Sequence, residues 1–161
     1  MPSYFRISRN IELSLLYYLE TNLATDWSGT TLCKTFKQVF TKNVSLPIVC
    51  VRLSDTASVR LEIGSNTLLN SHLLIIDIFA RSDGQRLDMA DYIKDKIKDG
   101  WVHYDHSHPS GSNTTLTRVA NGRDMVIDYV VDSKIDFGLD NVDEKDQFRH
   151  TISVRVRPAT L

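Results

Sequence analysis

The residues best suited to metal chemistry form a short run in the second half of the chain. His106 and His108 stand two positions apart, with Asp105 before them and His103 further back. In an extended strand, His106 and His108 would point to the same side, where their imidazoles could bind Zn²⁺ or another divalent ion. The alternative is a run of surface histidines beside a polar loop. Since no Cys-x-x-Cys or His-Glu-x-x-His spacing accompanies the run, the sequence favours the surface interpretation, and we expect no bound cofactor.

Acidic residues form a second group with the right chemistry for acid-base catalysis. They interleave with lysines along residues 85–99: Asp88, Asp91, Asp95 and Asp99. Their spacing more simply predicts the solvated face of a helix, where side chains three or four positions apart form ion pairs. No phosphate-binding glycine loop and no nucleophile motif accompanies them. The absence of these motifs therefore favours an interaction protein, without enzymatic activity, over an enzyme.

The composition is typical of one globular domain. The chain has 161 residues, of which 42% are hydrophobic and 24% charged, and its formal net charge of −1 gives no general attraction to nucleic acid. The longest apolar run, residues 73–76, is too short to span a membrane, and the first ten residues lack the apolar core of a signal peptide. We expect a single domain over residues 1–161, located in the cytoplasm in which it was made, with Cys33 and Cys50 reduced and Cys50 in a strand.

Residues 72–100 are the central unit of the predicted fold. Residues 72–81 alternate as a strand that is apolar on both sides, with only Asp77 polar among the inner positions. After a turn at residues 83–84, a helix begins near Gln85, and its apolar positions recur every three or four residues. These positions are Leu87, Ala90, Ile93, Ile97 and Trp101. Because one helix covers one side of a strand, the other side, with Leu73, Ile75 and Phe79, needs a second cover.

The remaining elements complete an α+β prediction. An amphipathic helix is expected from about residue 10, capped by Ser8 or Asn10, to about residue 25, followed by an irregular segment that packs. Residues 47–54 and 58–65 predict a hairpin that pairs Val51 with Leu61. Residues 101–108 can extend as a strand. The fold class is therefore a mainly antiparallel sheet with the N-terminal helix and the second helix packed against one face.

A second hairpin gives the clearest strand signal. Residues 125–137 and 148–157 both alternate between apolar and polar positions, so they should pair through the acidic loop between them. This pairing would bring Asp136 near Arg149 and Asp128 near Arg157.

Several of these segments together resemble a known family. The stretches PIVCVRLSD, VRLEIGS, HLLIIDIFARSDG and QRLDMADYIKDKIKDGW, between an N-terminal amphipathic helix and closing strands, are similar to the tail terminator proteins of long-tailed siphophages, the lambda-terminator-like group. The resemblance implies a structural virion protein of the tail or neck, assembled in the host cytoplasm. It would form a ring, usually a hexamer, that caps the head-proximal end of the tail tube, stops tube polymerisation and provides the surface for head-tail joining.

The resemblance also implies partners and surfaces. The partners would be further copies of the chain, the tail tube protein and a head-completion or connector protein, with DNA only passing through the lumen and no membrane. Leu73, Ile75 and Phe79 would lie at or near the packing between subunits, although the first helix could cover them instead. The acidic loop is a candidate for the lumen or for partner docking, because an acidic lumen would not hold DNA phosphates, or else a solvated hairpin tip. Its acidic residues are Asp140, Asp143, Glu144 and Asp146.

Two other functions stay open. The chain could be another neck or head-completion (stopper) protein of the head-tail connector, or a small metalloenzyme that uses the histidine run.

Overall fold

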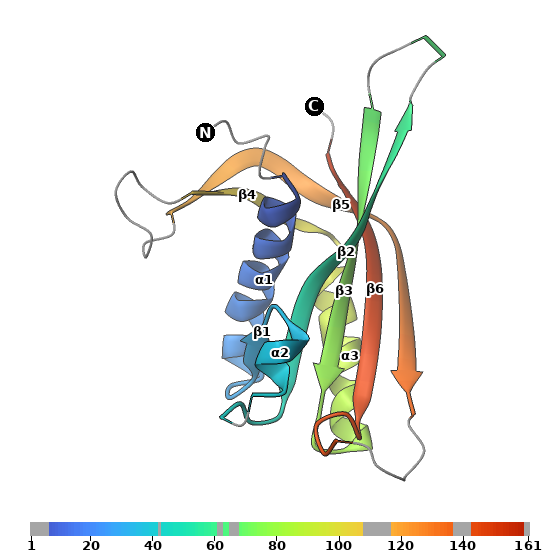
Figure 1. Ribbon diagram of the computed structural model, residues 1–161. Coiled ribbons are helices and arrows are strands. Elements are labelled where there is room, and N and C mark those ends of the chain that lie inside the picture. The colour runs from blue at the N-terminus through green and yellow to red at the C-terminus, as the bar shows by residue number, and fades with distance from the viewer. Residues whose placement is uncertain are drawn as a thin grey trace.

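A six-stranded sheet with helices on both faces forms the body of the molecule (Figure 1). The computed structural model describes residues 7–41, 43–60, 63–64, 68–107, 117–136 and 143–159. The helices and strands, in chain order, are α1 (Ile7–Asp26), β1 (Thr31–Cys33), α2 (Phe36–Val39), β2 (Ile48–Arg60), β3 (Leu68–Phe79), α3 (Asp83–Ile97), β4 (Trp101–Ser107), β5 (Thr117–Ile135) and β6 (Arg149–Pro158).

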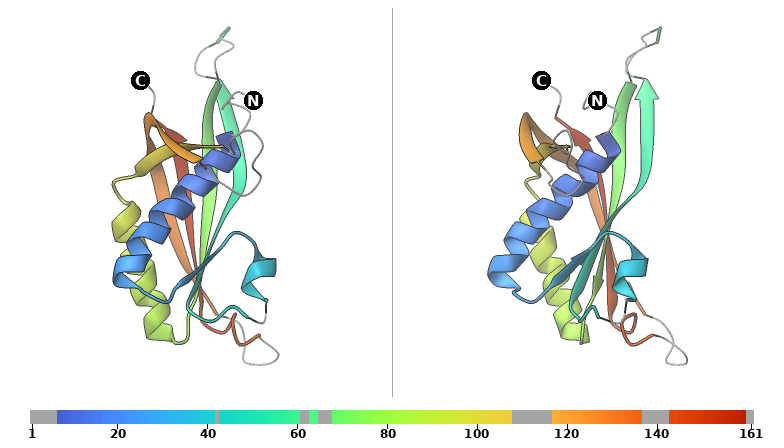
Figure 2. Two further views of the ribbon diagram at one scale, coloured as in Figure 1. Left: turned by 90° about the vertical axis from the view of Figure 1, so that its left-hand side faces the viewer. Right: turned by 60° about the vertical axis from the view of Figure 1, so that its left-hand side comes forward.

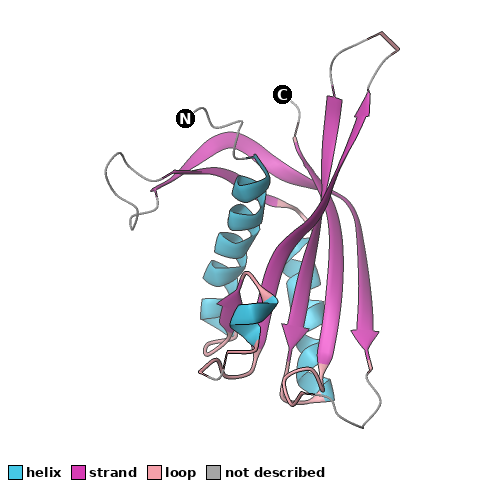
Figure 3. Cartoon of the chain, in the orientation of Figure 1, coloured by secondary structure: helices cyan, strands magenta, loops and turns pink. Residues whose placement is uncertain are grey.

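The strand order in the sheet is β1-β2-β3-β6-β5-β4. The β1–β2 pair is parallel, and the other pairs are antiparallel. The predicted α+β class is therefore confirmed, with a sheet that is mixed rather than purely antiparallel (Figure 3). In the described part of the chain, no helix combines the length and the apolar character that a membrane span requires.

Helices α1 and α3 lie on the same side of the sheet, which we call the inner face (Figure 2). The apolar side chains that β2, β3 and β6 contribute to it are at most 1% exposed, so they form the main core together with both helices. These strand residues are Val49, Val51, Leu74, Ile76, Ile78, Ile152, Val154 and Val156. The alternation predicted for residues 72–81 and 148–157 is thus confirmed.

Both ends of α3 are set by local chemistry. At the start, the Ser82 hydroxyl accepts a hydrogen bond from the Gln85 N–H, and the Gln85 side chain accepts one from the N–H of Arg81, the residue before the N-cap, in a variant of the capping box. At the end, Gly100 adopts φ of 79°, and a Cβ atom there would lie 2.1 Å from the carbonyl oxygen of Met125. Only glycine fits this position, because a side chain would force β4 away from β5.

The predicted apolar stripe of this helix needs a correction. Leu87 is 39% exposed, and Trp101 belongs to β4 rather than to the helix. Arg86 and Met89 are buried instead. Arg86 can be buried because its guanidinium donates to the carbonyl oxygens of Ile135 and Arg149.

The predicted hairpin between residues 47–54 and 58–65 is wrong. Strand β2 runs through the polar residues 54–56 without turning, and it pairs with β3 along its length, so that Val51 lies opposite Ile76. The register shifts between Leu53 and Asp55, which indicates a bulge at Ser54. A bulge absorbs one extra residue in a strand, and residues 54–56 contain no glycine or proline to enforce a turn.

Three smaller predictions have mixed outcomes. Ser8 and Asn10 lie inside α1 and do not cap it, since the helix includes Ile7. Asp136 contacts Arg86 at 2.8 Å instead of Arg149. The predicted pair of Asp128 with Arg157 is confirmed at 2.9 Å.

The opposite side of the sheet, the outer face, is covered at one end by α2. Phe36 and Phe40 contact the ring of Phe79 edge-on, at centroid distances of 6.3 and 6.0 Å. Phe79 is 0% exposed, and Cys50 is buried beside it in β2, as expected for a strand cysteine. The cover expected for this face thus comes partly from the segment after the first helix, not from that helix.

Beside this apolar cluster, the buried carboxylate of Asp77 has a complete set of partners. It accepts hydrogen bonds from Arg52 at 3.2 Å, from Arg149 at 2.8 Å and from the Thr151 hydroxyl at 2.7 Å. The ring of Phe36 lies 4.7 Å from the Arg52 guanidinium and 4.8 Å from that of Arg149. The cluster therefore joins β2, β3, β6 and α2.

Replacement of Asp77 by Asn is expected to destabilise the fold strongly. The side chain of Asp77 is 0% exposed, whereas those of Arg52 and Arg149 are 33% and 15% exposed, so two arginines would lose their shared counter-charge. Removing one partner of a buried ion pair costs about 3–5 kcal/mol of unfolding free energy. Because Arg52 is partly hydrated, we expect a loss at the lower end of this range, about 3 kcal/mol. Urea unfolding measures the loss. The matched control is Asp91→Asn, which breaks an exposed pair with Lys94 and should change stability by less than about 1 kcal/mol.

Candidate functional site

The outer face beyond α2 forms an open surface with apolar and polar side chains in register. Two rows cross β3, β6 and β5: Leu73, Arg155 and Tyr129 in one, and Ile75, Ser153 and Val131 in the next. We call these six residues the outer patch. Tyr129 is 47% exposed and Val131 is 54% exposed, while Leu73 and Ile75 are half-buried.

Arg155 connects the strands across the outer patch. Its guanidinium forms an ion pair with Asp55 of β2 at 3.2 Å, and its Nε lies 3.4 Å from the Tyr129 hydroxyl of β5. The side chain of Arg155 is only 16% exposed, and its charge is compensated by Asp55, which lies beside the patch on β2. The patch therefore exposes mainly the apolar surfaces of Ile75, Val131 and the Tyr129 ring.

The residues predicted for subunit packing do not share one environment. Leu73 and Ile75 belong to the outer patch. Phe79 is on the same strand side but is buried under Phe36 and Phe40, so it cannot contact a partner without displacement of α2. Sequence reasoning missed Tyr129 and Val131, because uninterrupted alternation over residues 125–137 puts both on the same side of the strand as Met125. The register shift between Ile127 and Tyr129 turns them to the outer face.

The acidic segment is anchored to the same end of the outer face as α2. Lys145 donates to the carbonyl oxygens of Val39 and Thr41, both at 2.8 Å. Asp143 and Glu144 are exposed, whereas Asp146 is partly buried and lies 3.6 Å from Arg149, and burial raises the pKa of its carboxyl group. Asp140 lies outside the described residues.

The histidine run lies on β4, and the surface interpretation is wrong for His103 and His106, which are buried. His106 is 2% exposed and His103 is 5% exposed. The Nδ1 of His106 lies 3.1 Å from the Tyr104 carbonyl oxygen, to which it must donate, and the Nδ1 of His103 lies 2.6 Å from the Asn121 amide. Within the described residues, no three His, Cys, Asp or Glu side chains group closely enough to hold a metal ion. His108 lies outside those residues.

The aspartates of α3 form ion pairs on its exposed side. Asp91 contacts Lys94 at 2.9 Å, and Asp95 contacts Lys98 at 2.6 Å. Lys94 also reaches Asp132 of β5 at 3.2 Å. The arrangement is that of the predicted solvated helix face.

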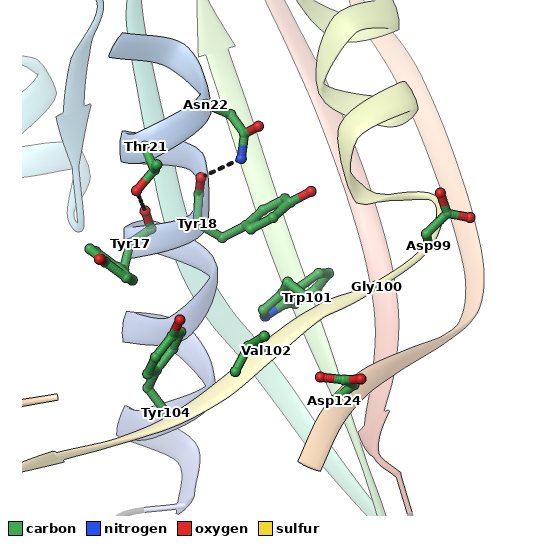
Figure 4. A pocket seen from close by; sticks show the side chains of 10 residues that line it. All are labelled: Tyr17, Tyr18, Thr21, Asn22, Asp99, Gly100, Trp101, Val102, Tyr104 and Asp124. Carbon is green, nitrogen blue, oxygen red and sulfur yellow. Dashed lines mark hydrogen bonds between the residues drawn. The ribbon is translucent and has the colours of Figure 1, made fainter. Parts of the chain in front are cut away.

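An aromatic pocket lies between α1 and the start of β4 (Figure 4). It has a volume of about 450 Å³. Its aromatic walls come from two helix residues, Tyr17 and Tyr18, and two β4 residues, Trp101 and Tyr104. Two carboxylates, Asp99 and Asp124, also line it, and both are exposed. Sequence reasoning included Asp99 only as part of the charged helix, because nothing local to α1 predicts contact with β4.

The arm formed by the ends of β2 and β3 projects beyond the helices (Figure 1). It carries exposed apolar side chains: Val59 is 63%, Leu68 is 50% and Ile63 is 107% exposed. Such residues on a projecting element are suited to contact another molecule.

No family model and no curated protein matches this sequence.

The buried histidines predict a specific dependence of stability on pH. Burial lowers the pKa of His72, His103 and His106 below the ordinary value of 6.5. The unfolded chain therefore binds more protons than the folded protein in this range, so the unfolding free energy should fall as the pH drops from about 7.5 to about 5.5. Urea titrations at both pH values measure the change. The double variant His103→Gln, His106→Gln should lose less stability over this interval than the unaltered protein; an equal loss would contradict the assignment.

Proposed function

We propose that this chain is the tail terminator of a siphophage, a protein whose copies form a ring on the head-proximal end of the tail tube. The observation that carries the proposal is a sheet with an open face and two partly unpaired margins. This arrangement supports repeated association of identical copies. The sequence resemblance is the reason for proposing that these copies form a ring on a tail tube.

The two unpaired margins are stretches of strand edge, one on β2 and one on β5, at opposite lateral edges of the sheet. In the described residues, β1 pairs only with Ile48–Cys50 of β2. Beyond residue 50, the edge of β2 that faces away from β3 therefore has no strand partner. Similarly, β4 pairs with residues 117–125 of β5, while residues 126–135 pair only with β6. Glu12 of α1 accepts a hydrogen bond from the Leu53 N–H at 2.8 Å, which satisfies one donor of the β2 margin.

Different surfaces on opposite sides of one subunit favour a head-to-tail contact. Such a heterologous interface generates a closed ring when the rotation between copies closes. The outer patch adjoins the β5 margin through Tyr129 and Val131, so one neighbour could cover both the patch and the unpaired backbone groups. The exposed carboxylates of Asp143 and Glu144 then suit the lumen or the docking of a tail or connector protein.

Deletion of the gene in its phage tests the function. Tails of uncontrolled length, or heads and tails that fail to join, are expected by electron microscopy, because no ring would stop tube growth. Normal tails with full infectivity would refute the proposal. Labelled protein found on the portal side of the neck, with tail length unchanged in the deletion, would indicate a head-completion protein instead.

Substitution of Val131 by Glu tests the proposed contact surface. A carboxylate at this 54% exposed position should leave the monomer folded but place an unpaired charge in the subunit interface. Complementation of the deletion phage should fall at least about 100-fold, since a loss of about 2.7 kcal/mol per contact corresponds to that factor. Leu87→Glu on α3, which is 39% exposed on the other side of the sheet, is the matched control and should complement normally. Circular dichroism verifies the fold of both variants, and equal complementation would exclude the outer patch as the interface.

A further inference from the structure

The aromatic pocket has rigid walls. Tyr18 stacks on Trp101 with an interplanar angle of 26° and a centroid distance of 6.3 Å, and Tyr17 meets Tyr104 edge-on at 5.4 Å. The Tyr18 hydroxyl donates to the Lys96 carbonyl oxygen at 2.7 Å, which fixes its ring between α1 and the end of α3. The rings are therefore held in place without a ligand.

The electrostatics of the pocket favour a cation. Among the described residues, no lysine or arginine lies within ion-pair distance of Asp99 or Asp124, and Lys98 interacts with Asp99 only at longer range. The charge of Asp99 contributes, after burial, to raising the pKa of the Tyr18 hydroxyl, so its negative potential extends to the aromatic wall. Aromatic faces attract cations through the ring quadrupole. Arg118 already lies 4.2 Å from the Tyr17 centroid, so one wall ring binds a guanidinium within this chain.

The pocket also contains an unpaired hydrogen-bond donor. Trp101 is 3% exposed, and its indole N–H has no hydrogen-bond partner in the described part of the molecule. A buried donor without a partner destabilises the protein unless a bound group accepts its hydrogen bond. Figure 4 shows the Trp101 ring among the other lining side chains, between the two tyrosines of α1 and Asp124. A ligand that fits these features carries a positive charge and an acceptor oxygen.

We infer that the aromatic pocket binds an organic cation, a guanidinium or an alkylammonium, that also carries a carbonyl acceptor, as an arginine or lysine residue does. The cation lies against the aromatic rings and near Asp99 and Asp124, and the carbonyl accepts from the Trp101 indole. This inference is independent of the proposed tail function.

A single indole signal provides the test. The chain has two tryptophans, so Trp27→Phe leaves Trp101 as the only indole N–H in a ¹⁵N–¹H correlation spectrum. Titration with Nα-acetyl-arginine amide or Nα-acetyl-lysine amide should shift this signal downfield and saturate. Nα-acetyl-citrulline amide, which has nearly the same shape as the arginine ligand without the charge, should bind at least about tenfold more weakly, equivalent to ~1.4 kcal/mol.

Variants separate the pocket from non-specific attraction of cations. Asp99→Asn combined with Asp124→Asn should weaken binding of the arginine ligand about tenfold, whereas Asp88→Asn combined with Asp91→Asn, on the exposed side of α3, should not change it. No saturable shift, equal affinity for the citrulline ligand, or an unaffected Asp99, Asp124 double variant would overturn the inference. Agmatine, which lacks the carbonyl, should bind without the downfield shift, and an equal shift would refute the role of Trp101.

The source of the cation is distinguished by a peptide. Tighter binding of acetyl-Gly-Arg-Gly-amide than of the single-residue ligand would identify a protein segment as the natural ligand. Equal affinity would identify a free small molecule. Both results support the pocket as a cation site.

Discussion

Strand β3 lies near the middle of the sheet and is apolar on both sides, which requires cover for both faces. Helices α1 and α3 cover the inner face along most of the strand. On the outer face, α2 covers only the end that contains Phe79, with the charge of Asp77 compensated next to it. Beyond Asp77, Ile75 and Leu73 continue onto an open surface. The same strand therefore changes from a core element to an open surface within a few residues.

The change of partner along β5 gives this open surface its margins. The first half of β5 pairs with β4 and the second half with β6, and the change occurs at Met125. One strand thereby supplies the wall behind the aromatic pocket, through Asp124, and the exposed side of the outer patch, through Tyr129 and Val131. Two separate short strands in place of β5 would have provided neither its long unpaired edge nor a continuous connection between the aromatic pocket and the outer patch.

Features with strong periodicity could be predicted from the sequence. The alternation in β3 and β6, the helix after Ser82 and the pairing of Asp128 with Arg157 all follow from positions close together in the chain or on paired strands. The turn predicted at residues 54–56 failed, because polarity alone does not distinguish a turn from an exposed bulge. The cover of Phe79 and the aromatic pocket could not be foreseen, since Phe36 and Tyr18 meet their partners only through tertiary packing. A local sequence pattern does not predict which distant segment of the chain packs against it.

The contact between Gly100 and the Met125 carbonyl oxygen restricts how this sequence can vary. The end of α3, the first residue of β4 and the change of pairing in β5 all meet at one point that has no room for a methyl group. Substitutions can change the aromatic and acidic residues around Gly100 while the path of the backbone stays the same. The pattern of a charged helix followed by a glycine and then an aromatic residue can therefore be used to search for distant homologues of this chain.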